Sequence, residues 1–351
     1  MRGRGLQGRL ALPVVAVLAA AGCTGSPGPV GTAGSGQPDG DATSLQWSRV
    51  RGPVDATVTT GGGWTLTVDP SGTRATLDGA DPVTVTAPDR FRVADALLDD
   101  GWALVTVQDR LEERPMVATV VDLDSGEQFT LDGDSDVPTT TGGSWALGDG
   151  TASHATVSPD GGWCVATVDL ASRTSQRRWC APPRTGFNGV SVTPDGTTML
   201  TFDDQRPSCR TPVRLDGDDV DPIGGVEPCL GWDAVALPGA VVWSETPRPT
   251  RVEQAVLRAR TGDGAVVDLG PGTSGTLVRC GEAAYFVRDP QRDGQPAALL
   301  RWAPGDDEAG VVYESPGGGP AFLAEPRCGG DALTLTVLAA SGDRQVTALL
   351  P

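Results

Sequence analysis

Short runs in which apolar and polar residues alternate fill most of the chain, and each run ends at a cluster of Gly, Pro or Asp. A period of two, bounded by turn residues, is typical of β-strands with one buried face. The window RVEQAVLRARTG (251–262) is the only plausible helix, and its Val, Ala and Leu alternate well enough for a strand. The pattern therefore predicts an all-β fold, which can be a sandwich, a barrel or a propeller.

A repeat distinguishes among these folds. Seven strands follow a turn in a similar way: GGGWTLTV (61–68), DDGWALVTV (99–107), DGGWCVATV (160–168), DGTTMLTF (195–202), PGAVVWSE (238–245), GEAAYFVR (281–288) and GDALTLTV (330–337). Their starts lie about 35 to 50 residues apart, the spacing of propeller blades, with one wider gap before Trp163. We therefore expect a β-propeller over residues 46–351 with about seven four-stranded blades. Six or eight blades stay open, because the wide gap is either a loop insertion or a degenerate blade.

Two of the repeats share a turn. SPDGGWCVATV (158–168) and TPDGTTMLTF (193–202) resemble the Ser-Pro-Asp-Gly blade motif of TolB-like propellers, a branch of the WD-repeat-like β-propellers. In that motif the turn links a blade's innermost strand to its second. Pro presets φ, Asp binds the backbone and Gly adopts the left-handed conformation. We expect turn roles, not chemistry, for Pro159, Asp160, Gly161, Pro194, Asp195 and Gly196. The resemblance also implies an envelope-associated interaction role.

The two ends of the predicted domain complement each other. The last repeat, residues 322–351, has room for three strands before the chain ends. The segment SLQWSRVRG (44–52) can supply the missing outer strand and so join the ends of the ring.

The N-terminal region is typical of an exported lipoprotein. Residues 1–22 combine three arginines with an apolar run too short for a bilayer core, which needs about 20 residues. The junction AAGC resembles the lipobox of bacterial lipoproteins, which implies that Cys23 is lipidated; the alternative is a cleavage further on that removes Cys23 or leaves it free. Residues 23–45, rich in Gly, Ser and Pro, predict a disordered tether. We expect a lipid anchor on the outer face of the cytoplasmic membrane.

The acidic charge excludes one class of partner. The chain carries 27 basic and 45 acidic residues, a formal net charge of −18, and every basic residue is Arg. Nucleic-acid binding needs a basic face, so we expect no nucleic-acid partner. The simplest role of the excess charge is solubility at a crowded surface.

The cysteines also indicate export. Apart from Cys23 there are six, and an even number in an exported chain suggests disulfides. Cys164 and Cys180 lie at equal distances from Ser172, the centre of an expected hairpin, so we expect them to face each other across two strands. For the remaining four, sequential pairing is favoured: Cys209 with Cys229 and Cys280 with Cys328.

Signals for catalysis are few. The only histidine is His154, and no Gly-x-Ser-x-Gly elbow accompanies it, so we expect a polar residue at a blade edge. Acidic runs at 122–127, 131–136 and 215–221 contain calcium-type oxygens but lack a full ligand loop with its distal Glu, so we expect them to form turns. We predict no catalytic residue, no metal site and no cofactor.

Tryptophans give the remaining candidates. Trp64, Trp102 and Trp163 start strands at matched positions, and we expect them to wedge between blades. Trp145 and Trp232 fall outside this register and are candidate binding residues, because a loop tryptophan is a good interface or sugar-stacking anchor.

Three functions remain after this reading, and the third, a purely structural envelope component, would lack a concave site. The first is a monomeric, non-enzymatic binding or scaffold module for an envelope protein, peptide or glycan, anchored to the membrane by its lipid. The alternative is an exported propeller enzyme, a lyase or hydrolase that uses Asp, Glu and Arg in the central channel. A converging pair of acids with an Arg at the channel mouth would favour the enzyme; an open, uncharged or Trp-rimmed face would favour binding.

Overall fold

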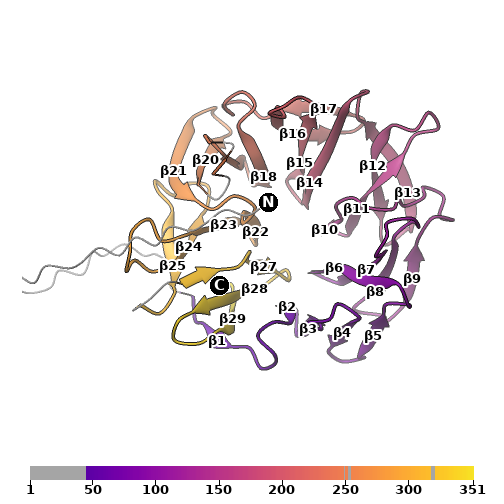
Figure 1. Cartoon of the computed structure of the whole chain (residues 1–351), viewed down its shortest axis with the longest axis horizontal. Coiled ribbons are helices and arrows are strands. Elements are labelled where there is room, and N and C mark those ends of the chain that lie inside the picture. Colours follow the sequence, from indigo (N-terminus) through magenta and orange to yellow (C-terminus); the bar gives the residue numbers. More distant parts are fainter. Residues whose placement is uncertain (1–44, 249, 252–253, 318–320) are drawn as a thin grey trace, which may run out of the picture. The chain divides into compact units, whose positions relative to one another are not determined.

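Seven antiparallel sheets stand around a central axis as the blades of a β-propeller (Figure 1). The computed structural model describes residues 45–248, 250–251, 254–317 and 321–351. Within these residues there is no α-helix, and so no helix able to cross a membrane. The prediction of an all-β propeller with seven four-stranded blades is confirmed.

Each of the first six blades is a meander that begins with its innermost strand and ends with its outermost. Blades 1 to 3 contain β2 (Thr57–Gly61), β3 (Trp64–Val68), β4 (Arg74–Asp78), β5 (Val83–Thr86); β6 (Phe91–Asp99), β7 (Trp102–Asp109), β8 (Val117–Asp122), β9 (Gln128–Leu131); and β10 (Ala146–Gly148), β11 (Thr151–Val157), β12 (Trp163–Asp169), β13 (Thr174–Cys180). Blades 4 to 6 contain β14 (Thr185–Thr193), β15 (Gly196–Asp203), β16 (Arg210–Asp216), β17 (Asp219–Pro222); β18 (Gly231–Leu237), β19 (Ala240–Glu245), β20 (Ala255–Thr261), β21 (Val266–Gly272); and β22 (Val278–Cys280), β23 (Ala283–Arg288), β24 (Ala298–Trp302), β25 (Gly310–Glu314). The window that resembled a helix thus contributes β20.

Blade 7 closes the ring with strands from both ends of the domain. Its inner edge is formed by β26 (Ala321–Leu323) and β27 (Arg327–Cys328), which both pair with β28 (Ala332–Ala339). The outer part is β29 (Arg344–Leu349) followed by β1 (Ser48–Arg49), with Ser48 opposite Thr347. The expected contribution of the 44–52 segment as the outer strand is therefore present.

Apolar side chains between neighbouring blades form the core. Leu66 of β3 belongs to the same cluster as Val93 and Val105 of blade 2, and Leu257 of β20 to the same cluster as Phe286 of β23. Second strands such as β7 and β19 are buried along almost their whole length, because a blade in the ring is covered on both faces. These strands read as apolar runs for that reason.

The register of the repeat differs from the sequence prediction in blade 3. Six of the seven aligned strands are second strands, but the one that starts at Trp163 is β12, a third strand. The second strand of blade 3 is β11, which follows a two-residue turn at Asp149 and Gly150, with φ of 51° and 65°. Two positive φ values in an Asp-Gly turn are typical of a tight hairpin. The wide gap is thus a shift by one strand and involves neither a degenerate blade nor an insertion.

The shift places the two Pro-Asp-Gly turns at different positions in their blades. The turn at 194–196 links β14 to β15, the innermost to the second strand, as the family motif implies. The turn at 159–161 links β11 to β12, the second to the third strand. Successive hairpins of a meander lie at opposite ends of its strands, so the two turns lie at opposite ends of their blades.

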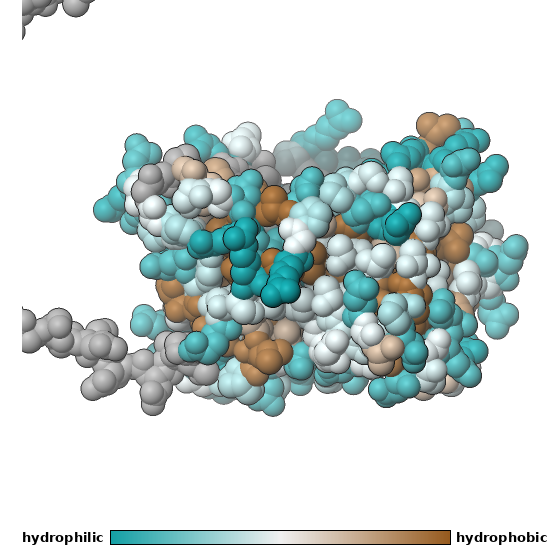
Figure 2. Space-filling model, turned by 90° about the horizontal axis from the view of Figure 1, so that it is seen from below, coloured by the Kyte–Doolittle hydropathy of each residue, from teal (hydrophilic) through white to brown (hydrophobic). Residues whose placement is uncertain are grey.

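The tryptophans at strand starts follow the same division. Trp64 and Trp102 are partly buried in clusters between blades. Trp163 is 44% exposed, opposite Val157, which is also exposed. The expectation that Trp163 wedges between blades is wrong, because it starts a third strand. In the side view of Figure 2, apolar residues form small separate patches on a largely polar surface.

Disulfides join three pairs of cysteines, the pairs that the sequence favoured. Cys164 and Cys180 lie opposite each other on β12 and β13. Cys209, between β15 and β16, joins Cys229 in the connection from blade 4 to blade 5. Cys280 of β22 joins Cys328 of β27, so this bridge links the inner edges of blades 6 and 7. The predicted signal peptide (1–22), Cys23 and nearly all of the predicted tether (23–45) lie outside the described residues.

Candidate functional site

A cavity of about 1070 Å³ lies along the axis of the ring. Its wall is formed by the innermost strands and the residues next to them, with contributions from all seven blades: Thr59, 95–100, 144–150, 188–194, 232–235, 277–282 and 325–328. Because each blade begins with its innermost strand, these strands run in the same direction and the cavity has two distinct ends. We call the end where the inner strands begin the mouth, and the end where they turn into the second strands the turn end.

Contacts between blades are different at the two ends. At the turn end the backbones approach closely, since a Cβ on Gly61 would lie 1.6 Å from the carbonyl oxygen of Gly329 and one on Gly148 would lie 2.2 Å from that of Val192. Only glycine fits such an approach. At the mouth, side chains such as those of Asp233 and Arg327 connect different blades.

The lining of the cavity is acidic. It contains seven carboxylates and three guanidinium groups, a net charge of −4 (three minus seven): Asp95, Asp99, Asp100, Asp149, Asp233, Glu282 and Glu325 against Arg210, Arg279 and Arg327. A narrow cavity with low-dielectric walls concentrates the field of such a charge and raises the local concentration of cations.

Three carboxylates from three blades meet at the mouth. They are Asp95 of blade 2, Asp233 of blade 5 and Glu325 of blade 7. Burial raises the pKa of each above its ordinary value. Arg327 opposes the rise of the pKa at Asp95 and Glu325, whereas the charges of Asp95 and Asp233 add to the rise at Glu325. Arg327 thus acts on two of these three carboxylates.

The mouth carboxylates differ in how they are held. Asp233 accepts hydrogen bonds from the hydroxyl of Ser244 and from the backbone N–H of Gly275 in blade 6, at 2.9 Å, so it connects two blades. Asp95 accepts the N–H of the next residue, Ala96, whose carbonyl oxygen accepts a bond from Arg327 at 3.3 Å. Glu325 is exposed to the water of the cavity. It is therefore the carboxylate of this group best placed to meet a ligand.

A Trp–Arg pair lies on another side of the mouth. The guanidinium carbon of Arg210 lies 4.6 Å from the ring centroid of Trp232, a cation–π contact, and Nη2 of Arg210 donates to the hydroxyl of Thr246 at 3.1 Å. Burial lowers the pKa of Arg210. Trp232, a candidate binding residue in the sequence analysis, is half-buried and lines the cavity.

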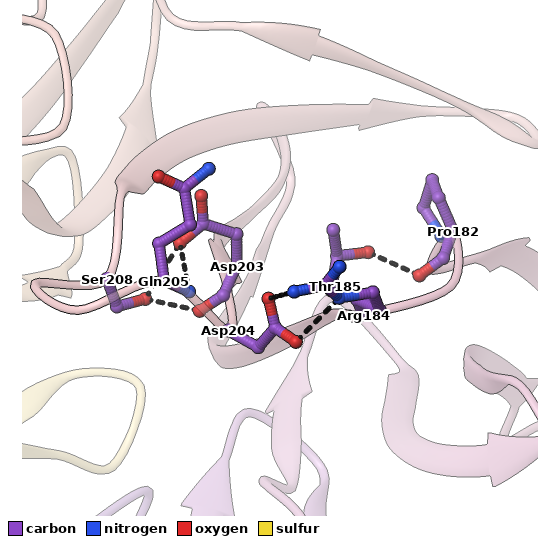
Figure 3. A network of polar contacts seen from close by, with 7 residues as sticks. All are labelled: Pro182, Arg184, Thr185, Asp203, Asp204, Gln205 and Ser208. Carbon is purple, nitrogen blue, oxygen red and sulfur yellow. Dashed lines mark hydrogen bonds and ion pairs between the residues drawn. The ribbon is translucent and has the colours of Figure 1, made fainter.

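The loop before Arg210 is held by a polar network, shown in Figure 3. The carbonyl oxygen of Asp203 accepts a bond from the hydroxyl of Ser208 at 2.6 Å, and its carboxylate accepts the N–H of Cys209 at 2.8 Å. Arg184, which precedes β14, donates to Asp204 at 2.8 Å and ties the loop to the start of the inner strand. Together with the disulfide of Cys209, these contacts fix Ser208 and Arg210 at the cavity wall.

The turn end contains a charge pair between two blades that are not neighbours. Nη2 of Arg279, in blade 6, lies 3.1 Å from Oδ2 of Asp195, in blade 4, and the two side chains are 15% and 23% exposed. The pair bypasses blade 5. The positive charge of Arg279 also stabilises the ionised carboxylate of Asp99 in blade 2. That carboxylate accepts the N–H of Asp149 at 3.1 Å. Arg279 thus connects blades across the axis.

This pair corrects one expectation for the Pro-Asp-Gly turns. The side chain of Asp160 does act within its own turn, where it accepts a hydrogen bond from Ser158. The carboxylate of Asp195 instead reaches Arg279, and it is Thr193 whose hydroxyl accepts the N–H of Asp195 at 3.2 Å. The difference arises because the turn at 194–196 lies at the axis.

His154 and Trp145 lie behind the cavity wall. His154 is 1% exposed, so the expectation of a blade-edge residue is wrong. Its ring stacks on Trp145, with centroids 4.9 Å apart, and Nδ1 lies 3.0 Å from the carbonyl oxygen of Ala155. Burial lowers the pKa of His154 and favours the neutral ring. Trp145 is itself a core residue, although it borders the cavity.

The acidic runs form turns. Asp122 accepts the N–H groups of Asp124 and Ser125 at 2.9 and 3.1 Å, and these bonds lower its pKa. Asp132 accepts the N–H of Asp134 at 2.9 Å, and Gly217, with φ of 59°, lies in the tight turn between β16 and β17. Among the residues that the structure describes, no group of three His, Cys, Asp or Glu side chains has the arrangement of a metal site.

The comparisons with known proteins support the fold. No family model and no curated protein matches the chain. The β-propeller domain of the Trilobed protease from Pyrococcus furiosus, described as having an open velcro topology, matches with a TM-score of 0.57 and 9% identity over 84% of this chain and 95% of that one. A prolyl endopeptidase matches with a TM-score of 0.55 and 13% identity over 84% of this chain, which spans 48% of the endopeptidase. TolB from Acinetobacter baumannii is also similar, at 14% identity and a TM-score of 0.42 over 73% of this chain and 64% of TolB. At such identities the likeness of the first two shows the β-propeller fold alone. In this chain, β1 closes the ring.

Proposed function

We propose that the chain is a cell-surface binding module, anchored through lipidated Cys23, and that it holds an envelope protein, peptide or glycan at the mouth of its central cavity. The observation that carries this proposal is the cavity itself. It is lined by every blade, and a half-buried Trp232 and incompletely neutralised carboxylates meet at one end of it. A rigid ring that presents converging polar groups and an aromatic is suited to hold a ligand.

The position of the only histidine also favours binding over triad hydrolysis. His154 is buried behind the wall with its Nδ1 against a backbone carbonyl, so it is not placed to activate a nucleophile in the cavity. Two of the similar structures come from peptidases, but this chain spans only 48% of the endopeptidase.

A crosslinking capture from intact cells tests the binding proposal. The full-length chain is compared with Trp232→Ala, with Trp163→Ala as the matched control, since Trp163 is exposed but lies outside the cavity. We expect one partner to be recovered with the wild type and the control, and to be lost with Trp232→Ala. Equal recovery with both variants would show that the mouth is not the binding face.

A Cys23→Ala variant tests the anchor in the same experiment. We expect the wild type in the membrane fraction and the variant in the soluble fraction, with the partner recovered from the anchored form. A wild type that is already soluble and captures nothing would contradict both the anchor and the binding role.

One observation favours an enzyme as the second candidate. Asp95 and Glu325, both with raised pKa, flank Arg327 at the mouth, and paired carboxylates of this kind can act as general acid and base. Cleavage of an envelope glycan or peptide by the wild type, lost in both Asp95→Asn and Glu325→Gln, would favour this candidate. Intact substrates after prolonged incubation would favour the binding module.

A further inference from the structure

We infer that the ligand of the cavity is cationic: a polypeptide segment whose Lys or Arg side chain enters the mouth beside the exposed carboxylate of Glu325, with Asp95 close by. This inference rests on the proposed binding function and names the chemistry that the site would recognise. Three properties of the cavity carry it: its net charge, the difference between its ends, and its size together with its apolar rim.

The first property is the charge of the lining. Seven carboxylates against three guanidinium groups leave an excess of four negative charges inside one cavity. Two of the three arginines at this site are engaged with the protein, Arg210 with Trp232 and Thr246, and Arg279 with Asp195. An incoming cation would therefore meet carboxylates that the protein itself does not balance.

The second property is the difference between the ends. At the turn end, Arg279 pairs with Asp195 and acts on Asp99, and the inner backbones approach within glycine-only distance. The other acids of that end, Asp100, Asp149 and Glu282, are exposed and solvated by water. At the mouth, Arg327 is the one guanidinium between Asp95 and Glu325, and it also donates to the carbonyl oxygen of Ala96. The place for a further cation is thus the mouth.

The third property is the size of the cavity and its apolar rim. A volume of about 1070 Å³ lies just above the range for small-molecule sites, about 300 to 1,000 Å³. That volume accepts a side chain together with the adjoining backbone. Trp232 offers an aromatic surface to the methylene groups of a Lys or Arg stem.

Calorimetric titration of the full-length chain with defined probes tests the inference. The probes are an acetylated, amidated pentapeptide Gly-Arg-Gly-Arg-Gly, the same peptide with citrulline in place of Arg, and the free polyamine spermidine. We expect the Arg peptide to bind at least tenfold more tightly than the citrulline peptide, and its binding to weaken as salt is raised. Tighter binding of spermidine than of the Arg peptide would overturn the assignment to a polypeptide.

Variants locate the binding. Glu325→Gln and Asp95→Asn should each weaken binding of the Arg peptide at least fivefold. Glu325→Lys should abolish it, because the new ammonium would occupy the place of the ligand. Glu308→Gln, an exposed acid of the β24–β25 connection outside the cavity, is the matched control and should bind as the wild type does.

The failures of this inference and of the proposed function are distinguishable. If the Arg and citrulline peptides bind equally, or if Glu325→Lys binds the Arg peptide as the wild type does, the cationic ligand is excluded. A cellular partner that is still lost with Trp232→Ala would then keep the mouth as the binding face for a ligand of other chemistry. If Trp232→Ala and Trp163→Ala capture that partner equally, the proposed function itself fails.

Discussion

The two ends of the cavity contain the same kinds of side chain in opposite arrangements. At the turn end, Arg279 lies 3.1 Å from Asp195 and also acts on Asp99, so one acid–base pair joins different blades, although burial still raises the pKa of Asp99. At the mouth, Asp95, Asp233 and Glu325 outnumber Arg327 and Arg210, and the pKa values of these three acids are raised. Charges matched across blades hold the ring together, whereas charges left unmatched at an opening are available to a ligand. The following variants test this difference, from the largest expected effect to the smallest.

Removal of the disulfide between blades 6 and 7 should have the largest effect on stability. Cys280 and Cys328 are 48 residues apart and join the inner edges of blades 6 and 7. We expect the pair of changes Cys280→Ala and Cys328→Ala to lower the free energy of unfolding by about 4 kcal/mol, measured in urea, because the unfolded chain gains freedom. We also expect weaker binding of the Arg peptide.

The bridge of blade 3 is the control for that experiment. Cys164 and Cys180 are 16 residues apart, and both are outside the cavity lining. Their replacement by Ala should cost about 3 kcal/mol and leave the affinity for the peptide unchanged. If both double variants affect affinity equally, the inner-edge bridge has no special relation to the cavity.

Breaking the charge pair at the turn end should destabilise the ring. Arg279→Gln leaves the partly buried Asp195 without its partner, and we expect a loss of about 2 kcal/mol, between the values for surface and buried pairs. Thermal unfolding measures this loss, and the combination Arg279→Gln with Asp195→Asn should recover part of it. If Arg279→Gln unfolds at the same temperature as the wild type, the structural role of the pair is contradicted.

The buried His154 should make stability depend on pH independently of the charges at either end of the cavity. The pKa of His154 is lowered from 6.5, so the folded protein keeps the ring neutral while the unfolded chain takes up a proton. The free energy of unfolding should therefore fall as the pH falls below 6.5, by up to about 1.4 kcal/mol per pH unit. His154→Phe should remove this component in urea titrations between pH 5 and 7. An unchanged pH dependence in the variant would place its source elsewhere.

Neutralising the mouth should have the smallest effect on stability. Because the pKa of Glu325 is raised from 4.5, its protonated form favours the folded state; that contribution is present below pH 4.5 and is lost as the pH rises through the raised value. Glu325→Gln should therefore keep or slightly raise the stability at pH 7, by less than about 1 kcal/mol for a solvent-exposed group. A clear loss of stability in urea would make Glu325 a structural residue and remove the contrast with Arg279.

Much of the fold follows from local patterns. Turn residues between short apolar runs predicted the blades, and the spare strand at 44–52 predicted the closure by β1. The misplacement in blade 3 was avoidable, because Asp149-Gly150 lies between two short runs and is the strongest local hairpin signal there. The more conspicuous Pro-Asp-Gly turn at 159–161 diverted the alignment to β12.

The site did not follow from such patterns. Asp95, Asp233 and Glu325 stand in three separate blades with no common motif, and Asp195 has the same turn residues before and after it as Asp160. The sequence by itself determined the strands, their turns and the cysteine pairs, because these depend on neighbours along the chain and on hairpin geometry. Only the tertiary structure decided which acids are matched by an Arg and which are not, because closure of the ring brings together charges that lie far apart in sequence.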